Sequence, residues 1–359
     1  MEIKSQDIQN NINIFSFYDL FNKTIENKTI LIFEPNKYHH ECTPGYSKYF
    51  VDLDYNVDVL THISGIDSFS LFGQYKKIRL ILFNHLDEIK RNSKKLSFII
   101  KKYNYVLIQT TNHHKKELYK KLGFFNINTS IFVFHDINKI DKYYSNYLKL
   151  NRIWTIGNFS KGLQVNPHYF GNIQIKEKTD KTRFFLTSTF NRNYTFLIEA
   201  SRRLKQENFN FELVVTGRSK SFNSNQIPKY LNNTFIFKHK VSYNELYKSV
   251  ESSDYIIIPI NNDNKINLQY KKNLATGSIQ LVYGFLKPAL INKEFASFYN
   301  LNGENSLIYN NIFDFYYTMK KAILLKNNDY KQIQGNLKNA EKDIYRTSIN
   351  NLKKVINEF

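Results

Sequence analysis

The chain has 359 residues, of which 42% are hydrophobic, and its 51 Lys and Arg outnumber its 31 Asp and Glu to give a formal net charge of +20. This length fits two domains of ordinary size, and the hydrophobic content is sufficient for packed cores, which excludes a disordered chain. The single cysteine excludes an internal disulfide framework and suits a reducing compartment.

The positive charge is spread along the chain. Lysine pairs such as Lys76-Lys77 and Lys115-Lys116 recur, and no arginine-rich tail or helix concentrates them. Such a distribution favours a solvated surface attracted to phosphates or an anionic membrane, and a nucleic-acid partner is not expected. The first residues lack the apolar core of a signal peptide, and no apolar run reaches bilayer length. We expect a cytoplasmic protein that is at most peripheral on the inner face of a membrane.

Short apolar runs alternate with helical patterns in the first half of the chain. The run Thr29–Pro35 indicates a strand, and Ile78–Asn84 is the nearly continuous apolar run typical of a strand buried on both faces of a parallel sheet. This alternation predicts βαβ units and an open parallel sheet. The other predicted elements are helices at 46–56, 96–104 and 113–124 and strands at 57–63, 105–111 and 129–136.

The pattern loosens near Trp154 and begins again after residue 181. The strands predicted after this point are 182–190, 211–217, 234–242, 254–260 and 288–292. Helices are predicted at 193–208 and 243–253, from residue 278, and after residue 312. Two successive alternations predict two Rossmann-like domains with parallel sheets facing a cleft. The predicted limits are an N-terminal domain at 1–170, a linker at 171–181, a C-terminal domain at 182–335, and a helical segment at 336–359 that could return to the N-terminal domain.

Five pieces of the second half follow one another in a definite order. They are a small-residue loop with Arg192 before the helix 196–200, the strand 213–217, the segment 241–246, the strand 253–259, and the helix and strand 281–290. In this order they resemble the donor-binding domain of GT-B glycosyltransferases, particularly the retaining family 4 type. The resemblance implies a GT-B fold with C-terminal helices, and ligands bound beyond the carboxyl ends of the strands.

The stretch Asn273–Asn292 places small residues at the start of an apolar helix. A helix N-terminus offers unpaired N–H groups and partial positive charge to a diphosphate, and Gly277 lets the backbone approach the anion. The hydroxyls of Thr276 and Ser278 could either cap the helix or bond phosphate oxygens. With the residues that the resemblance adds, the expected diphosphate site is Ser188, Arg192, Lys271, Thr276, Gly277 and Ser278, and Arg192 would be catalytic by stabilising the leaving diphosphate.

The glutamate pair usual in family 4 is absent, because Asn273 and Leu281 stand at its two positions. Asn273 could hold the sugar through uncharged hydrogen bonds, and Gln280 is one residue from the second position. The resemblance implies contacts to the nucleoside from Gly217, Arg218, Lys240, Val241 and Gln280.

The resemblance also implies that the first half binds the acceptor. Pro44 and Gly45 are expected in a turn that faces the cleft, with His39 and His40 close to the sugar or acceptor. His39 to Cys42 have the composition of metal ligands, but four adjacent residues cannot all converge on one ion, and Asp52-Leu53-Asp54 lies at a helix end, so no metal is expected.

Further histidines follow predicted strands. In family 4 a histidine in the position of His113 or His114 contacts the transferred sugar, so both are catalytic candidates, with an exposed pair at a helix start as the alternative. Asn166 and His168 could line the cleft, or their segment could pack the crossover between domains.

The resemblance therefore implies a glycosyltransferase of the hexosyltransferase type, retaining and metal-independent. It would move a sugar from a nucleotide-diphosphate donor to a hydroxyl of a glycan or lipid-linked acceptor in surface polysaccharide or glycoconjugate synthesis. The nucleotide sugar is a co-substrate, and no other cofactor is expected. The alternatives are a nucleotide-sugar epimerase of the same architecture, which needs acid and base carboxylates, and a non-catalytic GT-B binding protein, which the missing glutamates favour.

Overall fold

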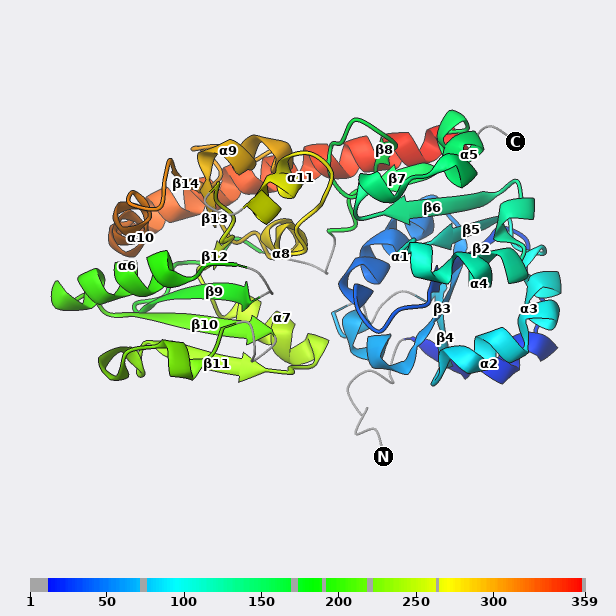
Figure 1. Ribbon diagram of the computed structural model, residues 1–359, viewed down its shortest axis with the longest axis horizontal. Helices are drawn as coiled ribbons and strands as arrows, with labels where there is room; N and C mark the ends of the chain where they lie inside the picture. The colour runs from blue at the N-terminus through cyan, green and yellow to red at the C-terminus, as the bar shows by residue number, and fades with distance from the viewer. Residues whose placement is uncertain are drawn as a thin grey trace. The chain divides into compact units, whose positions relative to one another are not determined.

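The computed structural model describes residues 12–71, 76–168, 174–188, 192–217, 222–262 and 265–356. The chain forms two compact units, one of Met1–Gly171 with Arg346–Phe359 and one of Asn172–Tyr345. Each unit is an α/β fold with its own parallel sheet (Figure 1). The division assigns the end of the long helix α11 (Asn327–Ile356) to the first unit.

The first unit is built on a parallel sheet with strand order β1-β4-β3-β2-β5-β6-β7-β8. The order reverses between β2 and β5, and such a reversal opens a crevice at the carboxyl ends of the strands. Its strands are β1 (Asn13–Ser16), β2 (Thr29–Glu34), β3 (Asn56–His62), β4 (Ile78–Phe83), β5 (Tyr105–Ile108), β6 (Ser130–Phe134), β7 (Ile153–Thr155) and β8 (Leu163–Gln164). Its helices are α1 (Thr43–Asp52), α2 (Leu86–Arg91), α3 (Ser93–Ile100), α4 (Lys116–Lys121), α5 (Ser145–Lys149) and the end of α11.

Helices cover both faces of this sheet, which explains why β2 is buried at all of its positions. On one face Leu31 and Phe33 pack in a core cluster with residues of α2 to α5. On the other face Phe50 of α1 stacks on Trp154 of β7 at 6.2 Å between ring centroids. The Tyr105 hydroxyl on β5 donates a hydrogen bond to the carbonyl of Ile356 in α11.

The second unit has a parallel sheet with strand order β11-β10-β9-β12-β13-β14, which reverses between β9 and β12. Its strands are β9 (Thr182–Ser188), β10 (Phe211–Gly217), β11 (Phe235–His239), β12 (Tyr255–Ile257), β13 (Ala289–Asn292) and β14 (Leu307–Tyr309). Its helices are α6 (Thr195–Gln206), α7 (Tyr243–Glu251), α8 (Ser278–Phe285), α9 (Lys293–Ala296), α10 (Phe315–Leu324) and the beginning of α11.

Helices also cover both faces of the second sheet. Leu197 of α6, Met319 of α10 and Tyr330 of α11 share one core cluster with the apolar side chains of the strands. On the opposite face α7 and α8 pack together through Tyr247 and Phe285, with their ring centroids 5.7 Å apart. The predicted alternation of strands and helices is confirmed in both units. Strands β1, β7, β8 and β14, which contain two to four residues each, were not predicted.

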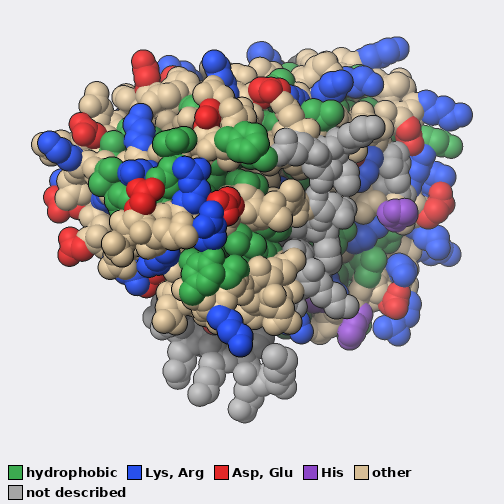
Figure 2. Space-filling model, turned by 60° about the vertical axis from the view of Figure 1, so that its left-hand side comes forward, with side chains coloured by type: hydrophobic (Ala, Val, Ile, Leu, Met, Phe, Trp, Pro, Cys, Tyr) green, Lys and Arg blue, Asp and Glu red, His purple; other side chains and the backbone are tan. Residues whose placement is uncertain are grey.

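Cations are dispersed over the surface as the sequence indicates. On the face shown in Figure 2, Lys and Arg side chains lie among acidic, apolar and uncharged side chains.

Candidate functional site

In the second unit the carboxyl ends of β9 and β12 lie next to each other where the strand order reverses. Ile257 of β12 is opposite Leu186 of β9 in a parallel pair, so the loops that follow both strands leave the same edge of the sheet. The loop after β9 contains Arg192, and α8 starts at Ser278 downstream of β12. This edge is where open α/β sheets bind ligands.

Helix α8 begins without a side-chain cap. Its N-cap residue is Gly277, and the amides of Ile279 and Gln280 make only long bonds, of 3.3 Å, to the carbonyls of Thr276 and Gly277. The Ser278 Oγ lies 2.8 Å from the Thr187 Oγ1 and so joins the helix start to the end of β9. The N-cap residue Gly277 has no side chain that could bond the first turn of α8, so the first-turn amides are candidates for contact with an anionic group.

Arg192 is a cation with two guanidinium nitrogens that lack a hydrogen-bond partner among the described residues. These atoms, Nε and Nη1, are shielded from solvent. The guanidinium carbon lies 5.4 Å from the ring centroid of Tyr270. Burial raises the pKa of Tyr299, and the backbone of Thr276 and the charge of Arg192 oppose that rise, which places Arg192 close to the start of α8.

Gln280 is the second unpaired polar side chain of this edge. It is fully buried on α8, and neither its Oε1 nor its Nε2 has a hydrogen-bond partner in the described part of the chain. Buried polar atoms are normally paired, so the unpaired atoms of Gln280 and Arg192 are candidate ligand contacts. The arrangement suits an anionic group at Arg192 and a hydroxyl-bearing group at Gln280.

The other residues predicted for the second unit are distributed around this edge. Lys271 does not join Arg192, because it forms an ion pair with Glu294. Gly217 ends β10 with a φ of 119°, which favours glycine, and the amide of Lys240 lies 3.5 Å from its carbonyl oxygen. Asn273 and Thr276 are buried, Val241 is half-buried, and Gly277 and Lys240 are exposed. Arg218 and the side chain of Ser188 lie outside the described residues.

Histidines gather at the carboxyl edge of the first unit. Of the nine histidines in the chain, seven lie at or shortly after the carboxyl ends of β2 to β6, namely His39, His40, His62, His85, His113, His114 and His135. Histidine rings can exchange protons and bind ligands, so this edge is a candidate functional surface.

Glu34 ties the loops after β2 and β5 together at the strand reversal. Its fully buried carboxylate accepts hydrogen bonds from the Asn36 amide at 2.8 Å, the Asn36 Nδ2 at 2.6 Å and the Thr110 Oγ1 at 2.5 Å. Burial raises the pKa of Glu34 to about 7, although these hydrogen bonds oppose the rise. Glu34 was not predicted as a site residue. The signal that could have indicated it is its position as the acidic residue that ends the otherwise apolar strand β2.

His39, Glu41 and His135 form a second cluster at this edge. The His39 Nδ1 lies 3.4 Å from the Glu41 Oε1, and the ring centroids of His39 and His135 are 4.4 Å apart. The His135 Nε2, the Asn36 Oδ1, the Gln109 Oε1 and the Thr111 Oγ1 are buried without a hydrogen-bond partner in the described residues. Four unpaired polar atoms at one edge again indicate a binding surface.

Several predicted acceptor residues are packed into the first unit instead. Pro44 and Gly45 do not form a turn, because they lie buried in the first turn of α1, where proline is well tolerated. His40 is buried, with its Nδ1 3.1 Å from the Thr61 Oγ1.

The segment with Asn166 and His168 is also buried. The amide of Asn166 donates a hydrogen bond to the Ser348 Oγ at 3.0 Å, and the carbonyl of Asn166 accepts one from the Tyr49 hydroxyl at 2.5 Å. These hydrogen bonds pack the backbone of the segment within the first unit, and the buried Oδ1 of Asn166 has no hydrogen-bond partner among the described residues. His114 is exposed in the turn His113–Lys115, and the side chain of His113 lies outside the described residues.

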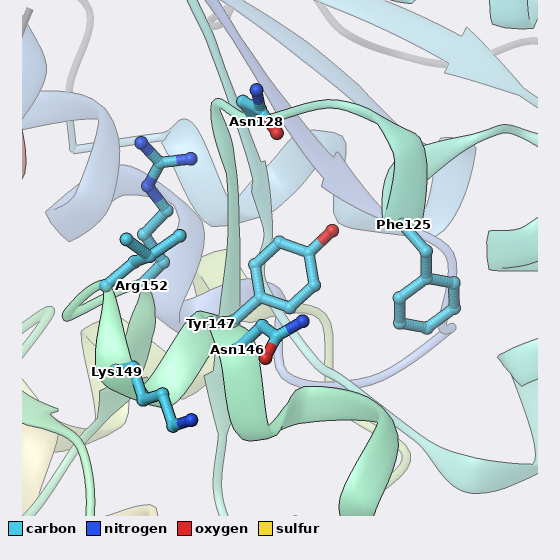
Figure 3. Close-up of a pocket in the computed structure, with 7 residues that line it drawn as sticks. Phe125, Asn128, Asn146, Tyr147, Lys149 and Arg152 are labelled. Atoms are coloured by element: carbon cyan, nitrogen blue, oxygen red, sulfur yellow. The ribbon is translucent and has the colours of Figure 1, made fainter.

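A cavity of about 360 Å³ lies at the opposite edge of the first sheet (Figure 3). Its lining comes from residues before the amino ends of β6 and β7, and it contains none of the predicted site residues. The lining residues are Phe125, Asn128, Asn146, Tyr147, Lys149, Leu150 and Arg152. Within the described residues, no group of three or more His, Cys, Asp or Glu is arranged to hold a metal ion.

No protein-family model matches the chain, and no curated protein matches it by sequence. Solved structures do match. A glycosyltransferase from Rickettsia africae is 15% identical with a TM-score of 0.57, and the match covers 93% of this chain and 99% of that chain. HepE from Anabaena, solved in complex with UDP and glucose, is 10% identical with a TM-score of 0.57, and the match covers 93% of this chain and 100% of that chain. At these identities the similarity establishes the fold, and the chain has the GT-B fold of these glycosyltransferases.

Proposed function

We propose that the protein transfers a sugar from a nucleotide-diphosphate donor to a hydroxyl group of an acceptor. The observation that carries this proposal is the half-buried Arg192, whose shielded Nε and Nη1 lack partners in the described residues, near the start of α8, which has no side-chain cap. In glycosyl transfer the bond from the sugar C1 to the donor phosphate oxygen breaks, and the diphosphate leaves with the electron pair. Arg192 and the first-turn amides of α8 would stabilise that negative charge.

Gln280 would bond a hydroxyl of the donor. Its carboxamide is buried on the same helix and has both a donor and an acceptor to offer. HepE, which has the same fold, was solved with UDP and glucose, so uridine nucleotides are the first donors to test. The first unit, with its carboxyl edge rich in histidine, would bind the acceptor.

The proposed acceptor is a glycan or lipid-linked glycan for surface polysaccharide or glycoconjugate synthesis, reached at an anionic membrane surface. No helix in the described ranges has both the length and the apolar character to cross a bilayer. Peripheral binding is supported by Phe313, in the turn before α10, and by Tyr317 and Leu324 of α10, which are 78%, 62% and 60% exposed. These residues follow each other at helical spacing and form what we call the α10 apolar stripe.

Cations accompany this stripe. The guanidinium carbon of Arg203 lies 5.7 Å from the ring centroid of Tyr317, and Lys321 and Lys326 are exposed beside the stripe. Aromatic side chains favour the interface of a bilayer, and lysine and arginine are attracted to anionic headgroups. The α10 apolar stripe with its cations therefore has the chemistry of a membrane-surface contact.

Thermal-shift screening tests the donor proposal. The protein should be stabilised by UDP or by another member of a panel of UDP, GDP, CMP and dTDP sugars, because a ligand that binds only the folded state raises its stability by mass action. Release of the nucleoside diphosphate from the stabilising sugar would then separate an enzyme from a binding-only protein of the same fold. If no nucleotide stabilises the protein and duplex DNA does, the proposal is wrong and the positive charge serves nucleic acid.

A further inference from the structure

The cavity at the amino edge of the first sheet belongs to the first unit alone, whereas the donor residues belong to the second unit. Tyr147 and Arg152 in its lining are buried, at 8% and 1% exposed. Asn128, Asn146 and Lys149 are exposed, and the view of Figure 3 shows Asn128 and Asn146 on opposite sides of the Tyr147 ring. Strand β6 separates this edge from the carboxyl edge by about 13 Å at the usual rise of a strand. A volume of about 360 Å³ is at the small end of the range for ligand cavities, so the cavity has room for a small group.

The lining combines apolar side chains with two carboxamides. Phe125 is half-buried and stacks on Phe132 with the ring centroids 5.4 Å apart, and Leu150 is 45% exposed. The side chains of Asn128 and Asn146 each offer donors and an acceptor of hydrogen bonds. A sugar ring has matching properties, because its C–H groups form an apolar face and its hydroxyls both donate and accept hydrogen bonds. The uncharged part of the lining therefore suits a sugar unit.

The charged side chains of the lining are positive. They are Lys149 and Arg152, and none of the seven described residues that line the cavity is acidic. Lys149 is exposed as the last residue of α5. Burial raises the pKa of Tyr147, and the charge of Arg152 opposes that rise, which places the guanidinium close to Tyr147. An exposed lysine ammonium pairs with a carboxylate or a phosphate, so the lining favours a sugar that carries a negative charge.

The helices next to the cavity carry an excess of positive charge. Helices α2, α3, α4 and α5 share one core cluster with β2 and β6, so they form one layer on one face of the first sheet. Cations occur along the whole chain, but the span from Leu86 to Lys149, which contains these helices, has 13 Lys and Arg and only 5 Asp and Glu. Such an excess attracts an anionic polymer more strongly than a neutral one, and salt screens the attraction.

We propose that this cavity is a second binding site for the acceptor, an inference that rests on the proposed function. It holds an acidic sugar unit of the acceptor polymer, other than the unit that receives the transferred sugar. The sugar ring lies against Phe125, its hydroxyls bond the carboxamides of Asn128 and Asn146, and its carboxylate or phosphate pairs with Lys149. Because two contacts with one polymer raise its effective concentration, the cavity increases the affinity for a long acidic glycan without taking part in bond formation.

Calorimetric titration of the full chain with charged and uncharged sugars tests the inference. Hyaluronan hexasaccharide supplies carboxylates and glucose 6-phosphate supplies a phosphate, while chitohexaose and glucose are their uncharged counterparts. At least one acidic sugar should bind, about tenfold or more tightly than its counterpart, which is the effect of one charged hydrogen bond. The acidic sugar that binds identifies the charged group as a carboxylate or a phosphate. If neither acidic sugar binds more tightly than its counterpart, the inference is wrong.

Two variants that remove the same charge locate the binding site. Lys149→Ala should weaken binding of the acidic sugar by about tenfold. Lys94→Ala, at an exposed position near the start of α3, should leave binding unchanged. In the wild-type protein the bound sugar should also protect Lys149 from acetylation and leave Lys94 reactive, which mass spectrometry measures without any substitution. Equal effects at both lysines would show that the sugar binds the positive surface in general and would overturn the proposed site.

The donor proposal is tested separately in the same variants. Lys149→Ala should bind the nucleoside diphosphate with the Kd of the wild type, because Lys149 belongs to the first unit. If the nucleoside diphosphate binds and no acidic sugar does, the cavity inference is wrong and the donor proposal stands. If an acidic sugar binds at Lys149 and no nucleoside diphosphate binds, the sugar transfer is wrong, the role of the cavity in holding an acceptor is lost with it, and a glycan-binding site remains.

Discussion

Glu34 and Arg192 are ionisable side chains with atoms shielded from solvent, and they differ in whether those atoms have hydrogen-bond partners. Glu34 has its hydrogen bonds supplied within the first unit, by Asn36 and Thr110. The Nε and Nη1 of Arg192 have no such partners in the described residues. The hydrogen bonds offset part of the cost of burying the Glu34 carboxylate, whereas shielded guanidinium nitrogens without partners are costly unless a ligand pairs with them.

Glu34 should make the stability of the protein depend on pH. Its pKa is raised from 4.5 to about 7. As pH rises above 4.5, the unfolded chain loses this proton, whereas the folded chain keeps it until about pH 7. The free energy of unfolding should therefore fall between these values, by on the order of 3 kcal/mol, and become level above them.

Urea unfolding at pH 5 and pH 8 measures this effect, and Glu34→Gln should remove most of the difference between the two pH values. The exposed Glu304 provides the control, and Glu304→Gln should retain the wild-type difference. An equal pH dependence in wild type and Glu34→Gln would show that Glu34 is not responsible.

Helices α1 and α11 contain glycines in opposite environments. A Cβ on Gly45 of α1 would lie 2.0 Å from the carbonyl oxygen of Pro167, whereas a Cβ on Gly335 of α11 would have nothing within 4 Å. Gly45→Ala should therefore destabilise the protein by about 1–3 kcal/mol through overpacking. Gly335→Ala should stabilise it by about 0.5–1 kcal/mol, because alanine has the higher helix propensity. Melting temperatures of the two variants check the opposite signs, and a shared sign would contradict the packing of α1 on the segment at Pro167.

The long apolar strands and the alternating helices could be predicted from the sequence, because burial on both faces leaves continuous apolar runs such as those of β2 and β4. Strands such as β8 at the side of the sheet could not, because two residues carry no periodicity. The start of α8 at Ser278 was predicted as a phosphate site, but the contact of the Ser278 hydroxyl with that of Thr187 on β9 could not be predicted, because it depends on tertiary packing.

The candidate site was predicted in part. The positions of Arg192 and Gln280 followed from the order of motifs, but their unpaired atoms are a property of packing. Glu34 and the pairing of His39 with Glu41 were missed, because they depend on how three separate loops meet at one sheet edge.

Because the whole chain has a net charge of +20, an anionic membrane surface is the expected partner of the α10 apolar stripe. The protein should co-sediment with vesicles that contain phosphatidylglycerol and bind pure phosphatidylcholine vesicles weakly, and added salt should weaken the binding because it screens exposed charges. The triple variant Phe313→Ser, Tyr317→Ser, Leu324→Ser should bind the anionic vesicles at least about tenfold more weakly through lost apolar burial. Phe98→Ser, which removes an aromatic ring that is 68% exposed in the first unit, is the control. Wild-type binding by the triple variant would exclude α10 as the contact.

The proposed sugar transfer depends on the binding of a nucleoside diphosphate at the carboxyl edge of the second unit. Calorimetric titration with UDP, or with the nucleoside diphosphate that stabilises the protein most, measures this directly in wild type, Arg192→Ala and Arg183→Ala. Arg183 is the matched control. It lies at the amino end of β9, the strand that precedes the loop with Arg192, and it forms an ion pair with Glu212. Arg192→Ala should raise the Kd by about 10- to 100-fold, the effect of a lost charged hydrogen bond, and Arg183→Ala should leave it unchanged. Equal affinity in wild type and Arg192→Ala would contradict the assignment of the donor site.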